Sequence, residues 1–211
     1  MANGIGKYVN TEDVLYKGEW KDDVQHGIGE EIFPDGSKYY GSFFEGSKHG
    51  DGTFSWSDGT VYKGNFLKNK IDGYGTMQYI DGRIYEGEWK DNRMEGKGTF
   101  TWADKKRYIG QYRNDKKWGC GVFIYTDNKI YEGFWYDGKQ HGIGIIRSQN
   151  SIQVGEWRMG KKIRILPPNE IPDLEDFVKK VREKIPKFEE YLGSNNNYQT
   201  IENEQQVSTN V

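Results

Sequence analysis

The chain has 211 residues and a net charge of −2. Hydrophobic residues make up 34% of it and aromatic residues 15%, and it contains 28 glycines. So few apolar residues argue against a thick two-layer core and favour a thin structure in which aromatic rings lie on bare backbone. Because the 30 basic and 32 acidic residues are interspersed, no basic face is expected to neutralise phosphates, and we expect no nucleic-acid partner. The single cysteine, Cys120, excludes an intrachain disulfide framework and a cysteine zinc cluster.

Membrane and export signals are also missing from the sequence. No apolar run approaches the ~18 residues of a membrane span, and residues 1–7 contain no apolar signal core. We therefore expect a cytoplasmic protein.

Residues 1–157 carry a repeat with a step of 23 residues. A Tyr-x-Gly-x-aromatic pattern begins at six tyrosines, each followed by a Gly-x-Gly at the same spacing: Tyr16, Tyr39, Tyr62, Tyr85, Tyr108 and Tyr131. Gly4 and Gly6 form a Gly-x-Gly without a preceding tyrosine, so residues 1–15 are predicted to be an N-terminal half repeat. Residues 154–157 supply a first half without a following Gly-x-Gly. The region 16–157 thus holds six whole repeats and a terminal half.

Within each repeat, apolar or glycine positions alternate with polar ones, which is typical of β-strands. Turn signals such as Pro34-Asp35-Gly36 separate the repeats, and a charged six-residue loop such as Lys90 to Glu95 is expected to join the two strands of a repeat. The predicted fold is all-β: an elongated single-layer antiparallel β-meander of 23-residue hairpin repeats, with a C-terminal α-helix and a disordered tail. Two strands at ~4.8 Å each give ~9.6 Å per repeat.

The glycines share a strand face with the aromatic rings. Glycine weakens a strand unless something must approach its backbone, so the missing Cβ atoms are predicted to form troughs in which neighbouring rings lie. In these features the chain resembles the MORN (membrane occupation and recognition nexus) repeat family, whose unit reads YxGxW…GxG, and the resemblance spans Gly4 to Trp157. It implies the ribbon fold and, through similar proteins in ciliary radial spokes, in parasite cytoskeletal rings and among myosin adaptors, a role in assembly.

The other strand face changes character along the chain. Its positions are polar in the early repeats, as at Lys17 and Lys63, and turn apolar in the last two. The apolar positions are Ile109, Cys120, Val122, Ile124, Phe134, Ile143, Ile145 and Val154. Because a one-sided sheet should keep its second face polar, we expect a helix or a protein partner to dock on these eight residues, which we call the docking face.

A Pro- and Lys-containing linker over 158–172 is expected to lead into an amphipathic helix over 173–192. Asp173 is a suitable N-cap, and the apolar stripe of the helix contains Leu174, Phe177, Val178, Val181 and Ile185. We expect this helix to cover the docking face of the fifth and sixth repeats. The open alternative is that the stripe and the face each bind a partner. The polar residues 193–211 are predicted to be disordered.

Two further sets of residues are candidates for binding. Rings in excess of what a thin core needs predict an aromatic groove that grips a helix or peptide, made of Tyr62, Phe66, Tyr85, Trp89, Trp102, Tyr108, Tyr131 and Trp135. The densest positive cluster is Arg158, Lys161, Lys162 and Arg164. It is expected to protect the last sheet edge from pairing or, alternatively, to contact acidic membrane lipid. An open strand edge over 7–10 would also allow end-to-end self-association.

No motif predicts catalysis, a metal site or a cofactor. The Gly-x-Gly copies lack the third glycine and the following helix of a dinucleotide site. His26, His49 and His141 are expected in loops without a ligand role, and Cys120 is expected to be a packed thiol. We therefore predict a non-enzymatic scaffold or adaptor that binds protein partners in a cytoskeletal or ciliary, radial-spoke-like assembly. The alternatives are a peripheral tether to anionic phosphoinositide membranes and a module that regulates an enzyme in trans.

Overall fold

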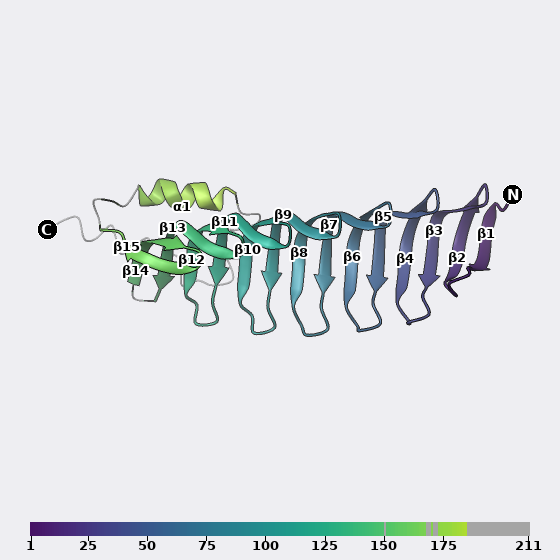
Figure 1. The fold of residues 1–211 in the computed structure, drawn as a ribbon, viewed down its shortest axis with the longest axis horizontal. Coiled ribbons are helices and arrows are strands. Elements are labelled where there is room, and N and C mark those ends of the chain that lie inside the picture. The colour runs from purple at the N-terminus through teal and green to yellow at the C-terminus, as the bar shows by residue number, and fades with distance from the viewer. Residues whose placement is uncertain (150, 168–169, 171–172, 185–211) are drawn as a thin grey trace.

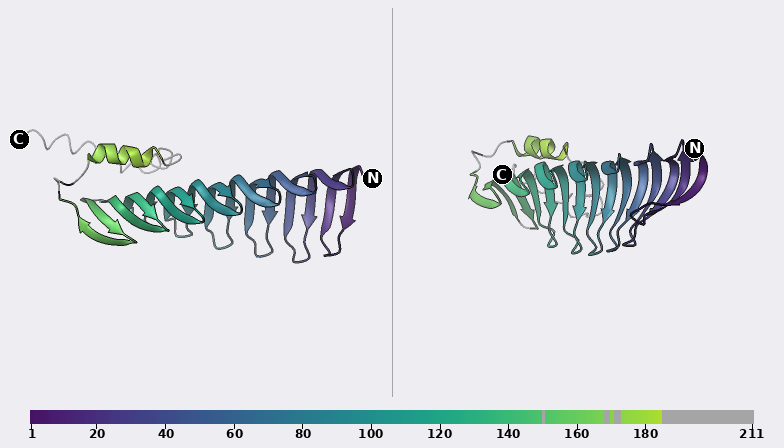
Figure 2. Two further views of the ribbon diagram at one scale, coloured as in Figure 1. Left: turned by 45° about the horizontal axis from the view of Figure 1, so that its top comes forward. Right: turned by 45° about the vertical axis from the view of Figure 1, so that its right-hand side comes forward.

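The computed structural model describes residues 1–149, 151–167, 170 and 173–184, with the backbone alone for Leu174 and Glu175. Its strands form one open antiparallel sheet in which each strand pairs with its neighbours in the chain. The helix α1 (Leu174–Arg182) lies over one face of this long sheet near its C-terminal end, as both Figure 1 and Figure 2 show. The predicted all-β single-layer meander with a C-terminal helix is confirmed. Residues 185–211, which include Ile185 of the predicted stripe and the predicted disordered tail, lie outside the described residues.

Strands β2 to β13 form the six whole repeats, and β1 is the N-terminal half repeat. The strands are β1 (Gly4–Val9), β2 (Leu15–Lys21), β3 (Val24–Ile32), β4 (Lys38–Phe44), β5 (Ser47–Ser55), β6 (Val61–Leu67), β7 (Lys70–Gln78), β8 (Ile84–Lys90), β9 (Arg93–Thr101), β10 (Arg107–Arg113), β11 (Lys116–Ile124), β12 (Ile130–Tyr136), β13 (Lys139–Ser148), β14 (Ser151–Arg158) and β15 (Lys161–Ile165). Among the described strands, the two outermost, β1 and β15, each pair on one side.

The turns inside the repeats are tighter than predicted. In place of a six-residue loop, Asp91 and Asn92 alone join β8 to β9, and both have positive φ angles, 48° and 66°. Two such residues are typical of a type I′ turn, whose twist matches that of antiparallel strands. The remaining predicted loop residues therefore belong to the strands. For the same reason His26, His49 and His141, which were expected in loops, lie in β3, β5 and β13.

The region 158–172, predicted to be a linker, contains the fifteenth strand. β15 pairs with β14, with Arg158 opposite Lys161 and Gly155 opposite Ile165. Met159 and Gly160 both have positive φ and form the two-residue connection. Backbone pairing and this turn are sufficient to add a strand, so β15 forms without the Gly-x-Gly signature of the other repeats.

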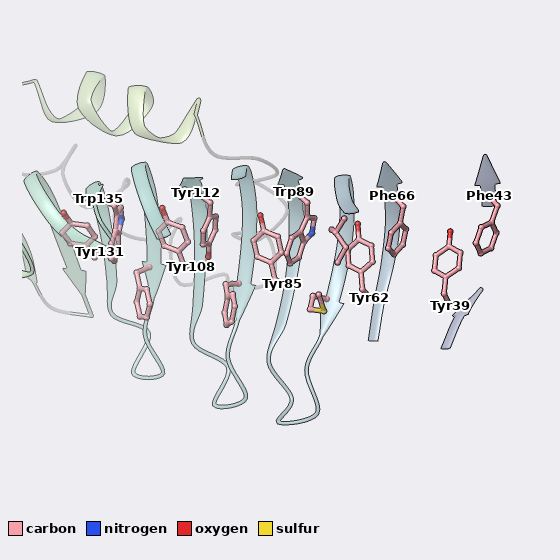
Figure 3. Close-up of a cluster of buried hydrophobic side chains, with 14 of the residues drawn as sticks. Tyr39, Phe43, Tyr62, Phe66, Tyr85, Trp89, Tyr108, Tyr112, Tyr131 and Trp135 are labelled. Atoms are coloured by element: carbon pink, nitrogen blue, oxygen red, sulfur yellow. The ribbon is translucent and has the colours of Figure 1, made fainter. Parts of the chain in front are cut away.

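The core is a row of aromatic rings on one face of the sheet (Figure 3). The six repeat tyrosines are each at most 1% exposed. Each hydroxyl donates a hydrogen bond to the carbonyl three residues later, as from Tyr85 to Glu88 (2.9 Å). The centroid of the Tyr85 ring lies 5.0 Å from that of Trp89 and 5.2 Å from that of Tyr112, which belongs to the next repeat. Such edge-on contacts run without a break from Trp20 to Trp157.

The predicted glycine troughs are confirmed. Gly87 and Gly98 lie opposite each other on β8 and β9. A Cβ atom on Gly98 would lie 2.6 Å from Cε2 of Tyr85, and one on Gly87 would lie 2.5 Å from the Cα of Gly98. Because real Cβ atoms do not approach so closely, the ring can lie there only over bare backbone.

Candidate functional site

The structure places α1 on the docking face. Val181 packs in one cluster with Ile109 and Val122, Val178 packs in a second with Ile145, and Phe177 contacts both. The first cluster also holds Cys120, Ile124 and Ile130, and the second also holds Ile143, Ile152, Val154 and Leu166. Phe134 remains 39% exposed. The centroids of the Phe134 and Phe177 rings lie 5.8 Å apart. The helix therefore occupies in cis the face that a partner would otherwise meet.

A buried carboxylate fixes the position of the helix. Glu132 in β12 is 1% exposed and lies between apolar cross-strand neighbours. It accepts a hydrogen bond from Nε of Arg147 (2.7 Å) in β13 and another from Nε of Arg182 (3.0 Å) in α1. A buried carboxylate needs charged or hydrogen-bonding partners, and Arg182 supplies one of the two from the helix, which joins α1 to the sheet at Glu132. A lone acidic residue in an otherwise apolar row is the sequence signal for this contact.

The residues with ligating or nucleophilic chemistry are few and scattered in the part of the chain that the structure describes. Cys120 is buried, and that burial raises the pKa of its thiol, which disfavours the reactive thiolate. Within 1–149, 151–167, 170 and 173–184, no three His, Cys, Asp or Glu side chains lie close enough together to hold a metal ion. In the same ranges, no helix is both long and apolar enough to cross a membrane.

Seven of the eight rings predicted to line an aromatic groove are buried. They are Tyr62, Phe66, Tyr85, Trp89, Tyr108, Tyr131 and Trp135, and all belong to the core row. Burial raises the pKa of the repeat tyrosines; for Tyr16 the pKa rises to about 12. Rings packed in this way have no free surface for a partner, which leaves only Trp102 of the predicted set part-exposed.

A second row of rings lies beside the core on the same face. These part-exposed rings, which we call the rim row, are Phe33, Trp56, Tyr79, Trp102 and Tyr125. Each stands six residues after the first glycine of its Gly-x-Gly, so the row recurs with the 23-residue step, which is the sequence signal that identifies it. The rings pack against the core. For example, the centroid of the Trp102 ring lies 4.6 Å from that of Phe100. Four repeat steps extend the row over ~38 Å.

Basic side chains lie over the rim row. Nζ of Lys48 is 5.2 Å from the ring centroid of Phe33. The guanidinium carbon of Arg83 is 4.7 Å from that of Tyr79, and Nζ of Lys129 is 6.0 Å from that of Tyr125. Cations at such distances over a ring face attract it electrostatically. Each of these cations is also paired with a carboxylate, Lys48 with Glu31, Arg83 with Asp81 and Lys129 with Asp127. The row is therefore lined by rings and neutralised ion pairs on its outer side, whereas its inner side is the aromatic core.

The four basic residues considered for lipid contact are exposed on β14 and β15. Arg164 forms ion pairs with Glu156 (3.0 Å) and Glu170 (2.5 Å). Lys162 donates a hydrogen bond to the side chain of Gln153 (3.2 Å). The two carboxylates therefore offset the charge of Arg164, one of the four residues of this cluster, Arg158, Lys161, Lys162 and Arg164.

The family to which the repeats match agrees with the repeat geometry. The family model "MORN repeat" matches residues 16–38, 39–61, 62–82, 85–107, 108–130 and 131–151, which together are more than half of the chain. No curated protein matches the chain. Among solved structures, it is similar to the SAS-4 (dCPAP) TCP domain of Drosophila melanogaster, solved in complex with a proline-rich motif of Ana2 (dSTIL), at 10% identity and a TM-score of 0.39, over 77% of this chain and 90% of that one.

Proposed function

Since the chain belongs to the MORN-repeat family, we propose that it is a non-enzymatic scaffold that binds protein partners along the rim row. The observation that carries this proposal is the series of five part-exposed rings on the face opposite α1. Aromatic side chains bring large contact area at low entropic cost and are frequent anchors of interfaces. Because the core row holds these rings from below, little order has to be gained on binding.

The dimensions of the rim row define the shape of the partner. A row of ~38 Å accommodates an extended segment of about 11 residues or a helix of about 25 residues. The rings repeat at ~9.6 Å, which matches every third residue of an extended segment in the polyproline II conformation, where residues three apart face the same side at ~9.3 Å. We therefore favour an extended, ring-contacting segment as the bound form.

We extend the proposal to a cytoplasmic, cytoskeletal assembly, with a ciliary, radial-spoke-like setting as its most specific form. What supports this extension is the resemblance to repeat proteins of such assemblies. Imaging of the tagged chain in ciliated cells tests it: enrichment along the axoneme is expected, and a diffuse or membrane-bound distribution would contradict it.

Peptide binding to matched variants tests the proposed use of the rim row. Random peptides displayed on phage are selected on the full chain, and the affinities of the winners are measured. Tyr79→Ala is expected to weaken binding about tenfold or more, as truncation of an interface anchor does. Tyr40→Ala is the control, because Tyr40 is exposed on the opposite face. An equal loss in both variants, or no loss in either, would count against the proposal.

A further inference from the structure

Lys117, at the start of β11, places its ammonium group among four rings. The distances from Nζ to the ring centroids are 4.6 Å for Trp135, 4.9 Å for Phe123, 5.3 Å for Trp102 and 5.4 Å for Tyr108. One of these rings, Trp102, belongs to the rim row and the other three to the core. The cation is therefore inside the aromatic surface on which a partner would lie.

The comparison with Lys48 shows what Lys117 lacks. Lys48 stands at the same position three repeats earlier, and it forms an ion pair with Glu31 of the neighbouring repeat. In the register of Lys117, Phe100 occupies the place of Glu31. Within the described part of the chain, no carboxylate lies at ion-pair distance from Lys117. Lys106, the nearby cation that acts on Lys117, is itself paired with Asp104 (2.8 Å).

The fold does not require a cation at this position. Ile71 and Met94 occupy it in the third and fourth repeats and pack with the core. Burial lowers the pKa of Lys117 to about 8. The charged lysine therefore lowers the stability of the folded chain. A residue that an apolar side chain could replace, and that weakens the fold, points to a use in binding.

We propose that Lys117 is the acceptor for an acidic side chain of the bound segment, so that the rim row selects peptides in which Asp or Glu adjoins an aromatic or apolar residue. This inference rests on the proposed function, because the same face must receive the segment. The carboxylate would form the ion pair that Glu31 supplies to Lys48, while the neighbouring apolar residue would lie on Trp102. The ammonium group is partly buried and surrounded by rings. It therefore suits an acidic side chain flanked by apolar residues of the same peptide better than it suits a hydrated lipid headgroup.

Peptide selection on two forms of the chain tests the inference. A phage library of random peptides of about 12 residues, long enough to span the row, is selected on the full chain and on Lys117→Met, which copies Met94. Thermal unfolding first establishes that the variant is folded. Selection on the unchanged chain is expected to enrich Asp or Glu beside apolar residues. Those peptides should bind Lys117→Met about tenfold or more weakly, and replacing their acid by the amide should cause a similar loss.

The outcomes separate the two proposals. If the selected peptides respond to Tyr79→Ala but show no preference for acids, or bind Lys117→Met unchanged, the role of Lys117 is overturned and the proposed function stands. If no selected peptide responds to Tyr79→Ala, both are overturned.

Discussion

Glycine serves two separate purposes in each repeat. Gly98 lies in extended backbone directly beneath the ring of Tyr85, whereas Gly96 has a φ of 67° and lies within the bulge of β9, between Met94 and Gly98. The first role depends on the missing Cβ atom, and the second depends on backbone freedom. The two glycines of the same Gly-x-Gly are thus required for different physical reasons.

Substituting the trough glycine should therefore be more damaging than substituting a glycine that only has positive φ. Gly98→Ala is expected to lower the free energy of unfolding by about 3 kcal/mol or more, because its Cβ would meet the buried ring of Tyr85. Gly36→Ala is the matched control: its φ is 89° but nothing lies within 4 Å, so only about 1–2 kcal/mol is expected. Urea unfolding measures both, and equal losses would refute the trough.

The destabilising effect of Lys117 should appear as a pH dependence of the free energy of unfolding. The pKa of Lys117 is lowered by burial to about 8 in the folded chain, against about 10.4 when unfolded. Below the folded value the protonated lysine destabilises the fold; between the two values the unfolded state binds more protons, so stability rises with pH. Lys117→Met should thus raise the free energy of unfolding at pH 7 by about 1 kcal/mol, a figure reduced by partial exposure and cation–π attraction. The gain should fade towards pH 10 in urea titrations, and a pH-independent gain would contradict this account.

At the scale of elements, sequence alternation predicted the hairpins well because every repeat imposes the same pattern on its strands. It missed β15, since Lys161 and Lys162 belong to no repeat signature and the strand is held by backbone pairing. It also missed the ion pairs of Glu132, because a charge in an apolar row shows its partners only after the helix has docked. The rim row was within reach of the sequence, since Tyr79 and Trp102 obey the repeat step.

The helix should be releasable by one substitution. Val181 in α1 is 1% exposed, so Val181→Asp would bury an unpaired carboxylate against Ile109 and Val122 unless α1 detached. We expect detachment, seen as faster amide hydrogen exchange in β11 and β12 and as binding of a dye for exposed apolar surface. Lys179→Asp introduces the same group on the exposed side of α1 and should leave both readouts near those of the unchanged chain. Dye binding that is equal in the two variants would show that α1 does not cover this face.

At the scale of the whole molecule, stability is passed along the sheet from one strand to the next. The structure pairs each strand with its chain neighbours, and the ring ladder links the repeats by contacts such as that of Tyr62 with Trp89 (5.6 Å between centroids). Such an array behaves approximately as a sum of repeats and the interfaces between them. Its cooperativity therefore depends on an unbroken ladder.

A break in the middle of the ladder should uncouple the two ends. Trp89 contacts the tyrosines of two repeats and donates a hydrogen bond from Nε1 to the carbonyl of Gly75 (3.2 Å). Trp89→Ala is expected to cost about 3–5 kcal/mol and to split thermal unfolding into two transitions. Trp20→Ala, at the N-terminal end of the ladder, should lower stability while keeping one transition. Calorimetry distinguishes these outcomes, and a single transition in Trp89→Ala would argue against unfolding in separate segments.

We propose different tasks for the two faces: the rim row would bind a partner, whereas α1 covers the docking face. The most direct test is a nuclear magnetic resonance titration of the full chain with a peptide selected on it. We expect shifts of the indole signals of Trp56 and Trp102 and of the ring signals of Tyr79, with the signals of α1 unchanged. Shifts confined to α1, Ile109 and Val122, with the rim row unaffected, would contradict it.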